Sequence, residues 1–152
     1  MEVKNLKLLA TSEEDLRVIA AHLQDAIVSI KDIASLKKNR IFLIQLNRFM
    51  WEDVEKGVFR RNKRVRTVLK FDNVISVSSK NINRKDNENF LDFLTIESNL
   101  LPDKNYEIKL IFSGEAIIKI IVEIKDIIIF CVILEQNIPI ALYVEIIKNT
   151  PT

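Results

Sequence analysis

One histidine and one nearby aspartate come closest to catalytic chemistry in this chain. His22 and Asp25 lie three residues apart in a segment with helical apolar spacing, so the carboxylate could orient the imidazole. Catalysis would also need a nucleophile, and no spacing singles out Ser12, Ser29 or Cys131. Because the chain has one histidine, its sequence argues strongly against a zinc site with several histidine ligands. We therefore rank an enzyme using His22 and Asp25 third among three functions.

Acidic residues and glycines do not form a recognisable cofactor motif. Glu52, Asp53 and Glu55 are close together but lack the Asp-x-Asp-x-Asp-Gly spacing of a calcium loop, which favours a solvated acidic turn. Gly57 and Gly114 are the only glycines and stand far apart, so no Walker loop or dinucleotide-binding loop is present. The sequence therefore predicts no metal site and no cofactor.

The strongest binding candidate is the segment from Arg60 to Lys70, which we call the basic ribbon. It contains no acidic residue. Its candidate binding residues are all cations: Arg60, Arg61, Lys63, Arg64 and Arg66. Alternate residues of a strand lie about 6.7 Å apart, near the spacing of successive phosphates, so Arg64 and Arg66 could each contact one. The second-ranked function is therefore a nucleic-acid or phosphate-binding module.

The same cations also have a purely structural explanation, which we favour. Arginine on an outward strand face near a sheet edge discourages pairing with a second chain. The acidic residues between Glu52 and Glu55 could then fold back and neutralise the ribbon. Trp51 and Phe59 are near enough in sequence to stack on bases, but this proximity alone is not specific for nucleic acid.

Length and composition are those of a globular protein with one domain spanning residues 1–152. A chain of 152 residues can bury a substantial core without a disulfide or a metal. A net charge of only +2 creates no global attraction to nucleic acid or to an anionic membrane. A single cysteine, no secretory signal pattern and no apolar stretch long enough to cross a bilayer predict a soluble cytoplasmic protein.

The clearest helix signal lies near the N-terminus. Thr11 and Glu14 have the spacing of a capping box, which predicts that a helix begins there. The next apolar residues recur at helical spacing and form one stripe: Leu16, Ile19, Ala20 and Leu23. This stripe predicts an amphipathic helix that packs on a sheet.

Most of the remaining chain has the pattern of β-strands. The strand that begins at Arg40 is apolar on both faces over Ile41–Ile44, which predicts a central position. Residues 64–71 alternate between polar and apolar, with Val65, Thr67, Leu69 and Phe71 toward the core and the other side mostly toward solvent. Asp72-Asn73 predicts a turn into a short partner strand over residues 74–79. Ser113-Gly114 predicts the centre of a hairpin between residues 106–112 and 115–123.

The C-terminal apolar run from Ile127 to Leu134 fits either a buried strand or a buried helix, although its β-branched residues favour a strand. We leave both alternatives open for residues 127–135. This run either packs in the core or forms the surface through which the protein binds a partner protein or a second copy of itself.

Several segments resemble an uncharacterised, mainly alphaproteobacterial family known as domain of unknown function 2948. They are residues 6–10, 15–26 and 46–52, with looser similarity over 61–68 and 112–114. The resemblance implies a bacterial protein without an assigned activity. It also implies a helix after the last hairpin, where this chain has the β-branched run.

Together these patterns predict an α+β fold. We expect a mostly antiparallel sheet of about seven or eight strands, with the N-terminal amphipathic helix packed on it and a second, C-terminal helix as an alternative for the chain end. The first-ranked function is a small non-enzymatic binding or scaffold protein, because the chain has abundant core residues and no assembled catalytic chemistry.

Overall fold

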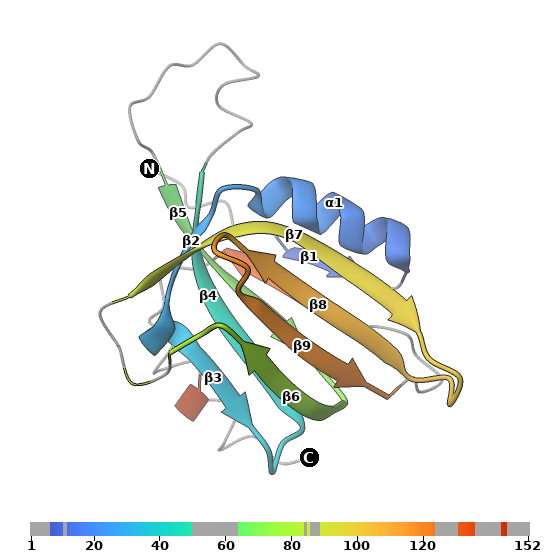
Figure 1. Ribbon diagram of the computed structural model, residues 1–152. Helices are drawn as coiled ribbons and strands as arrows, with labels where there is room; N and C mark the ends of the chain where they lie inside the picture. Colours follow the sequence, from blue (N-terminus) through green and yellow to red (C-terminus); the bar gives the residue numbers. More distant parts are fainter. Residues whose placement is uncertain are drawn as a thin grey trace.

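The computed structural model describes residues 7–10, 12–49, 64–83, 85, 89–123, 131–135 and 144–145. In this part of the chain one N-terminal helix packs on a strongly curved antiparallel sheet, which confirms the α+β fold (Figure 1). The sheet curls strongly and nearly closes on itself. No helix among the described residues is long and apolar enough to cross a membrane.

Helix α1 (Glu13–Leu23) begins one residue later than the capping box predicts. Its N-cap is Ser12, whose Oγ accepts a hydrogen bond from the Asp15 backbone N–H at 3.2 Å. Thr11 lies outside the described residues. Three acidic residues in the first turn stabilise the positive end of the helix dipole, which fits a start at Ser12. The predicted apolar stripe is confirmed, because all of its members are buried: Leu16, Ile19, Ala20 and Leu23.

The described strands form one sheet of ten, and every pairing is antiparallel. In spatial order they are β1 (Lys7–Ala10), β10 (Cys131–Glu135), β5 (Arg64–Phe71), β4 (Ile41–Phe49), β2 (Ile27–Ser29), β7 (Phe90–Leu100), β8 (Tyr106–Phe112), β9 (Ile117–Val122) and β6 (Val74–Lys80). Strand β3 (Ile33–Leu36) pairs with β4, and a short 3-10 helix, η1 (Ile30–Asp32), precedes it.

The predicted central position of β4 is confirmed. This strand pairs with β2, β3 and β5, and its residues 42–46 are all buried. Strand β5 is also interior along part of its length, because β10 pairs with Thr67–Phe71 on the side opposite β4. The edge-strand explanation of the basic ribbon therefore does not apply to Thr67–Phe71, and for Arg64 and Arg66 it stays a prediction. Val68 is buried as well, so the outward face of β5 is less open to solvent than the alternation suggests.

The turn at Asp72-Asn73 leads to a different strand partner from the one expected. Residues 74–80 do form a strand, β6, but it pairs with β9 instead of turning back onto β5. Asn73 adopts a left-handed conformation with φ 58°, and its carbonyl accepts the Glu123 N–H at 2.8 Å. That contact fixes a corner at which the chain leaves one half of the sheet for the other.

The hairpin between β8 and β9 is confirmed. The two strands pair from Tyr106↔Val122 to Ile111↔Ile117. Gly114 has φ 71°, a conformation that glycine adopts without steric cost, and Glu115 follows it with φ 61°. The most predictable turn of the sequence thus forms as its residue types require.

The C-terminal apolar run is a strand where the structure describes it, since Cys131–Glu135 form β10. Residues 127–130 lie outside the described part, as does the expected loop from Trp51 to Asn62. Near the chain end, only Val144 and Glu145 are described, and both are helical. A role of this run in binding a partner or a second copy stays a prediction.

One hydrophobic core joins the helix to the curved sheet. The apolar stripe of α1 packs in the same cluster as side chains from β4, β5, β7, β8 and β9. Two aromatic pairs strengthen it: the ring centroids of Phe42 and Phe71 lie 6.3 Å apart, and those of Phe93 and Phe112 lie 6.0 Å apart. This core joins α1 to both halves of the curved sheet.

Candidate functional site

The end strand β6 faces β3, a strand that branches from β4, across a seam. Among the described strands, β3 pairs only with β4 and β6 pairs only with β9, so each has an edge without a strand partner. Figure 1 shows β3 and β6 on facing arms of the fold, and side chains from both line one cavity. We call this gap the seam.

One end of the seam is closed by a set of contacts around Arg40, which we call the clasp. The Arg40 Nη2 donates to Glu123 Oε2 at 2.6 Å, and its Nε donates to the Val74 carbonyl at 3.4 Å. In return, the Val74 N–H donates to the Arg40 carbonyl at 2.9 Å. The clasp therefore ties the turn after β3 to the start of β6 and to the end of β9.

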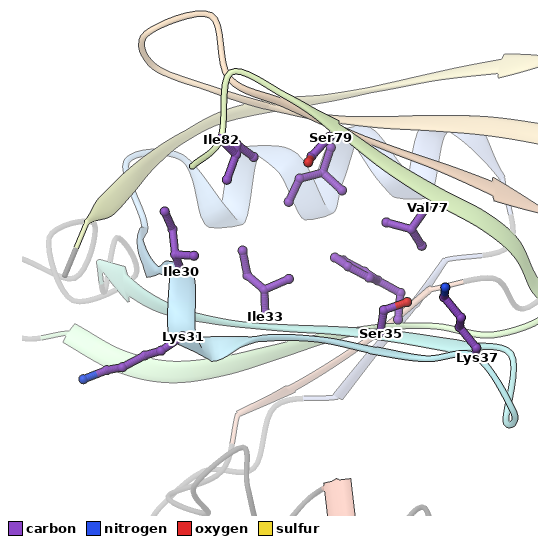
Figure 2. A pocket seen from close by; sticks show the side chains of 10 residues that line it. Ile30, Lys31, Ile33, Ser35, Lys37, Val77, Ser79 and Ile82 are labelled. Carbon is purple, nitrogen blue, oxygen red and sulfur yellow. The ribbon is translucent and has the colours of Figure 1, made fainter. Parts of the chain in front are cut away.

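Beyond the clasp the seam widens into a cavity of about 500 Å³, which we call the seam cavity. Its apolar lining comes from both arms of the sheet and from the segments that flank them: Ile30, Ile33, Phe42, Val77, Ile82 and Ile118. Figure 2 shows Ile30 and Ile33 on one side and Val77 and Ile82 on the other, directed into a common space. The volume lies within the range of about 300–1,000 Å³ that is usual for small-molecule sites.

The polar lining residues of the seam cavity are two lysines and two serines: Lys31, Ser35, Lys37 and Ser79. No aspartate or glutamate is among the lining residues that the structure describes. In Figure 2 the side chain of Lys31 points away from the cavity, whereas the amine of Lys37 is turned toward Val77 at the other end. The charged side chains among the described lining residues are therefore both positive, and Lys37 is the one whose amine is directed toward the opposite strand.

A second cavity, of about 590 Å³, lies at the clasp end of the seam. It shares Ser35, Lys37 and Val77 with the seam cavity, and its further lining includes Arg40 and Ile75. The exposed side chain of Ile75 adds apolar surface there. Lys37 therefore lines both cavities.

Comparison with known protein families decides the classification of the chain. Residues 6–131 match the model of DUF2948, described as a protein of unknown function. The chain belongs to the DUF2948 family. No curated protein and no solved structure gives a significant match. All residues that line the seam cavity, from Ile30 to Ile118, fall within the DUF2948 match.

The basic ribbon of this DUF2948 domain is only partly described. Arg60, Arg61 and Lys63 lie outside the described residues, and Arg64 and Arg66 are in β5. The side chain of Arg66 is exposed. Two residues further along the same face Val68 is buried, and Lys70 Nζ lies 3.5 Å from Asp72 Oδ1. The described part of the ribbon therefore offers one exposed arginine, and its binding role stays a prediction.

His22 and Asp25 lie at the C-terminal end of α1, away from the seam. His22 is half-buried in the last turn, and Asp25 is exposed just after the helix with φ 65°. The Asp25 backbone N–H donates to the Phe93 carbonyl at 3.1 Å, which fixes the helix end to β7. Neither residue lines either of the two cavities. A catalytic role for this pair stays a prediction.

The residues of the seam cavity were not predicted from the sequence. Ile82 gives the one signal that could have indicated it, because this large apolar residue lies in the otherwise polar segment 80–89. Nothing local distinguishes Lys37 from its neighbour Lys38. Among the described residues no group of three or more potential ligands could hold a metal ion.

Proposed function

We propose that this DUF2948 protein is a small non-enzymatic binding protein that holds an apolar small molecule in the seam cavity. The observation that carries the proposal is a cavity of about 500 Å³ between β3 and β6, which have no described pairing with each other, lined by apolar side chains of these strands and of the segments that flank them. Apolar side chains predominate among the described lining residues, and none of these residues is a histidine, cysteine or carboxylate, so the lining favours binding over acid–base catalysis.

The lining also predicts how affinity should depend on the size of the ligand. Each buried methylene contributes roughly 0.8 kcal/mol, which corresponds to about a fourfold change in affinity. Lengthening a linear alcohol should therefore tighten binding by about this factor per methylene until the cavity is full. Beyond that length the gain should stop.

A titration with hexanol, octanol and decanol, followed by the backbone amide resonances of the protein, tests the proposal. We expect the largest shifts at residues of the seam, such as Ile33, Val77 and Ile82. Val77→Phe should narrow the cavity and weaken binding. Val18→Phe is the matched control, because Val18 is 62% exposed on α1 and lines neither cavity. No alcohol binding, or equal binding by the two variants, would refute the proposal.

Polyanion binding by the basic ribbon is a second candidate, supported by the exposed side chain of Arg66. Affinity for RNA that depends on the ribbon should fall steeply as salt is raised, because counterions compete for the phosphates. It should also fall in an Arg61/Arg64/Arg66 triple alanine variant. Equally weak retention of RNA by wild type and this variant would rule the candidate out.

A further inference from the structure

We propose that the ligand of the seam cavity is an anionic amphiphile, a free alkyl carboxylate whose head group binds Lys37. This inference rests on the proposed function and names the class of its ligand. It follows from the distribution of charge around a mainly apolar cavity, because the described lining residues include two lysines and no acidic residue.

Lys37 is the cation that the structure leaves available for an anion. None of the ion pairs between described residues involves it. It lies in the turn after β3, lines both cavities, and directs its amine toward Val77 (Figure 2). A carboxylate placed there would have its alkyl chain directed into the apolar interior of the seam.

The other cations among the described residues that line the two cavities, Lys31 and Arg40, are less suited to this role. The Arg40 guanidinium pairs with the Glu123 carboxylate at 2.6 Å and donates to the Val74 carbonyl, so its positive charge is already balanced by Glu123. The Lys31 side chain points away from the cavity (Figure 2). Lys37 is therefore the residue that selects an anionic head group.

Charge and hydrogen bonding determine how large the selectivity should be. An ion pair at a solvent-exposed rim contributes little, and one that is partly shielded by an apolar ligand contributes more. We expect decanoate to bind about three to ten times more tightly than decanol at low ionic strength. Salt should reduce this advantage, since Lys37 is exposed and its field is screened.

Calorimetric titration of the full chain with decanoate and with decanol at neutral pH tests the inference. Lys37→Gln should abolish the advantage of decanoate and leave the affinity for decanol unchanged. Lys38→Gln is the matched control: it removes the same charge from an exposed neighbour that lines neither cavity, and should keep the advantage. Lys31→Gln should keep it as well.

The outcomes separate this inference from the proposed function. If decanol binds as tightly as decanoate, or if Lys37→Gln keeps the advantage, the inference is overturned while the cavity remains a binding site. If the advantage disappears in Lys31→Gln instead, the assignment to Lys37 is wrong. If neither ligand binds the wild-type chain, the proposed function itself fails. Melting curves of each variant show whether it is folded.

Discussion

Arg40 and Glu123 are 83 residues apart in sequence, yet their side chains meet at 2.6 Å and fasten one end of the seam. Both side chains are partly exposed, at 40% and 42%, so solvent and salt weaken the attraction between them. The pair therefore contributes less to global stability than to the local geometry of the corner. That division between global and local effects can be measured.

Glu123→Gln should remove the ion pair and loosen the clasp. We expect a loss of about 0.5 kcal/mol in the free energy of unfolding, together with faster hydrogen exchange of the Val74 amide, which donates to the Arg40 carbonyl. Glu107→Gln is the control, because Glu107 forms a comparable pair with Lys109 at 3.6 Å on another strand. Unchanged exchange at Val74 in Glu123→Gln would contradict the role given to the clasp.

Ser12→Ala should destabilise the protein by about 1 kcal/mol, because it removes the side-chain acceptor of the Asp15 N–H at the start of α1. Ser12→Asp keeps an acceptor at the same position and adds a charge that favours the helix N-terminus, so it should be close to wild type. Chemical denaturation followed by circular dichroism measures both. Equal loss in the two variants would show that the cap does not act through this hydrogen bond.

Thr67→Val should stabilise the protein by about 1 kcal/mol. The Thr67 hydroxyl is buried in β5 without a hydrogen-bond partner among the described residues, and an uncompensated buried hydroxyl is costly. Valine has nearly the same shape and no polar atom. The matched control is Thr95→Val on β7, where the side chain is exposed and the change should be near zero. A destabilised Thr67→Val in thermal unfolding would indicate that the hydroxyl does have a partner.

Gly114→Ala should cost about 1 kcal/mol, although a methyl group there would meet no atom within 4 Å. The cost arises from the backbone, because φ is +71° and an L side chain is strained in that region. Gly114→Asn should cost less, since asparagine tolerates the left-handed region better. Thermal unfolding of the two variants makes the comparison. An alanine variant as stable as wild type would contradict this explanation.

Sequence patterns that lie within a single helix or hairpin predicted that helix or hairpin well. The stripe from Leu16 to Leu23 placed α1 on the sheet, because helical spacing alone decides which side chains share a face. Ser113-Gly114 placed the β8–β9 hairpin, because a short turn determines the pairing of the strands on either side. The N-cap was placed one residue early, at Thr11 instead of Ser12, because both residue types can cap and only the backbone conformation distinguishes them.

Features that depend on distant segments were not predictable in the same way. The partner of β6 is β9, and the choice depends on a corner held by Asn73, Glu123 and Arg40 rather than on the turn residues alone. The seam cavity arises where β3 and β6 face each other, so Ile33 and Val77 become neighbours only in the folded chain. The basic ribbon was visible as local charge, but the burial of Val68 beside it required the structure.

The seam separates two strands that have no backbone ladder between them, and this has a kinetic consequence. Around the cavity the opposing faces meet through side chains, and the clasp joins them mainly through one arginine. The proposed ligand could therefore enter through rotamer changes and a small separation of β3 and β6, without breaking any backbone hydrogen bond of the sheet. Binding and release of the ligand should then be fast compared with unfolding, because side chains reorient far faster than strands separate.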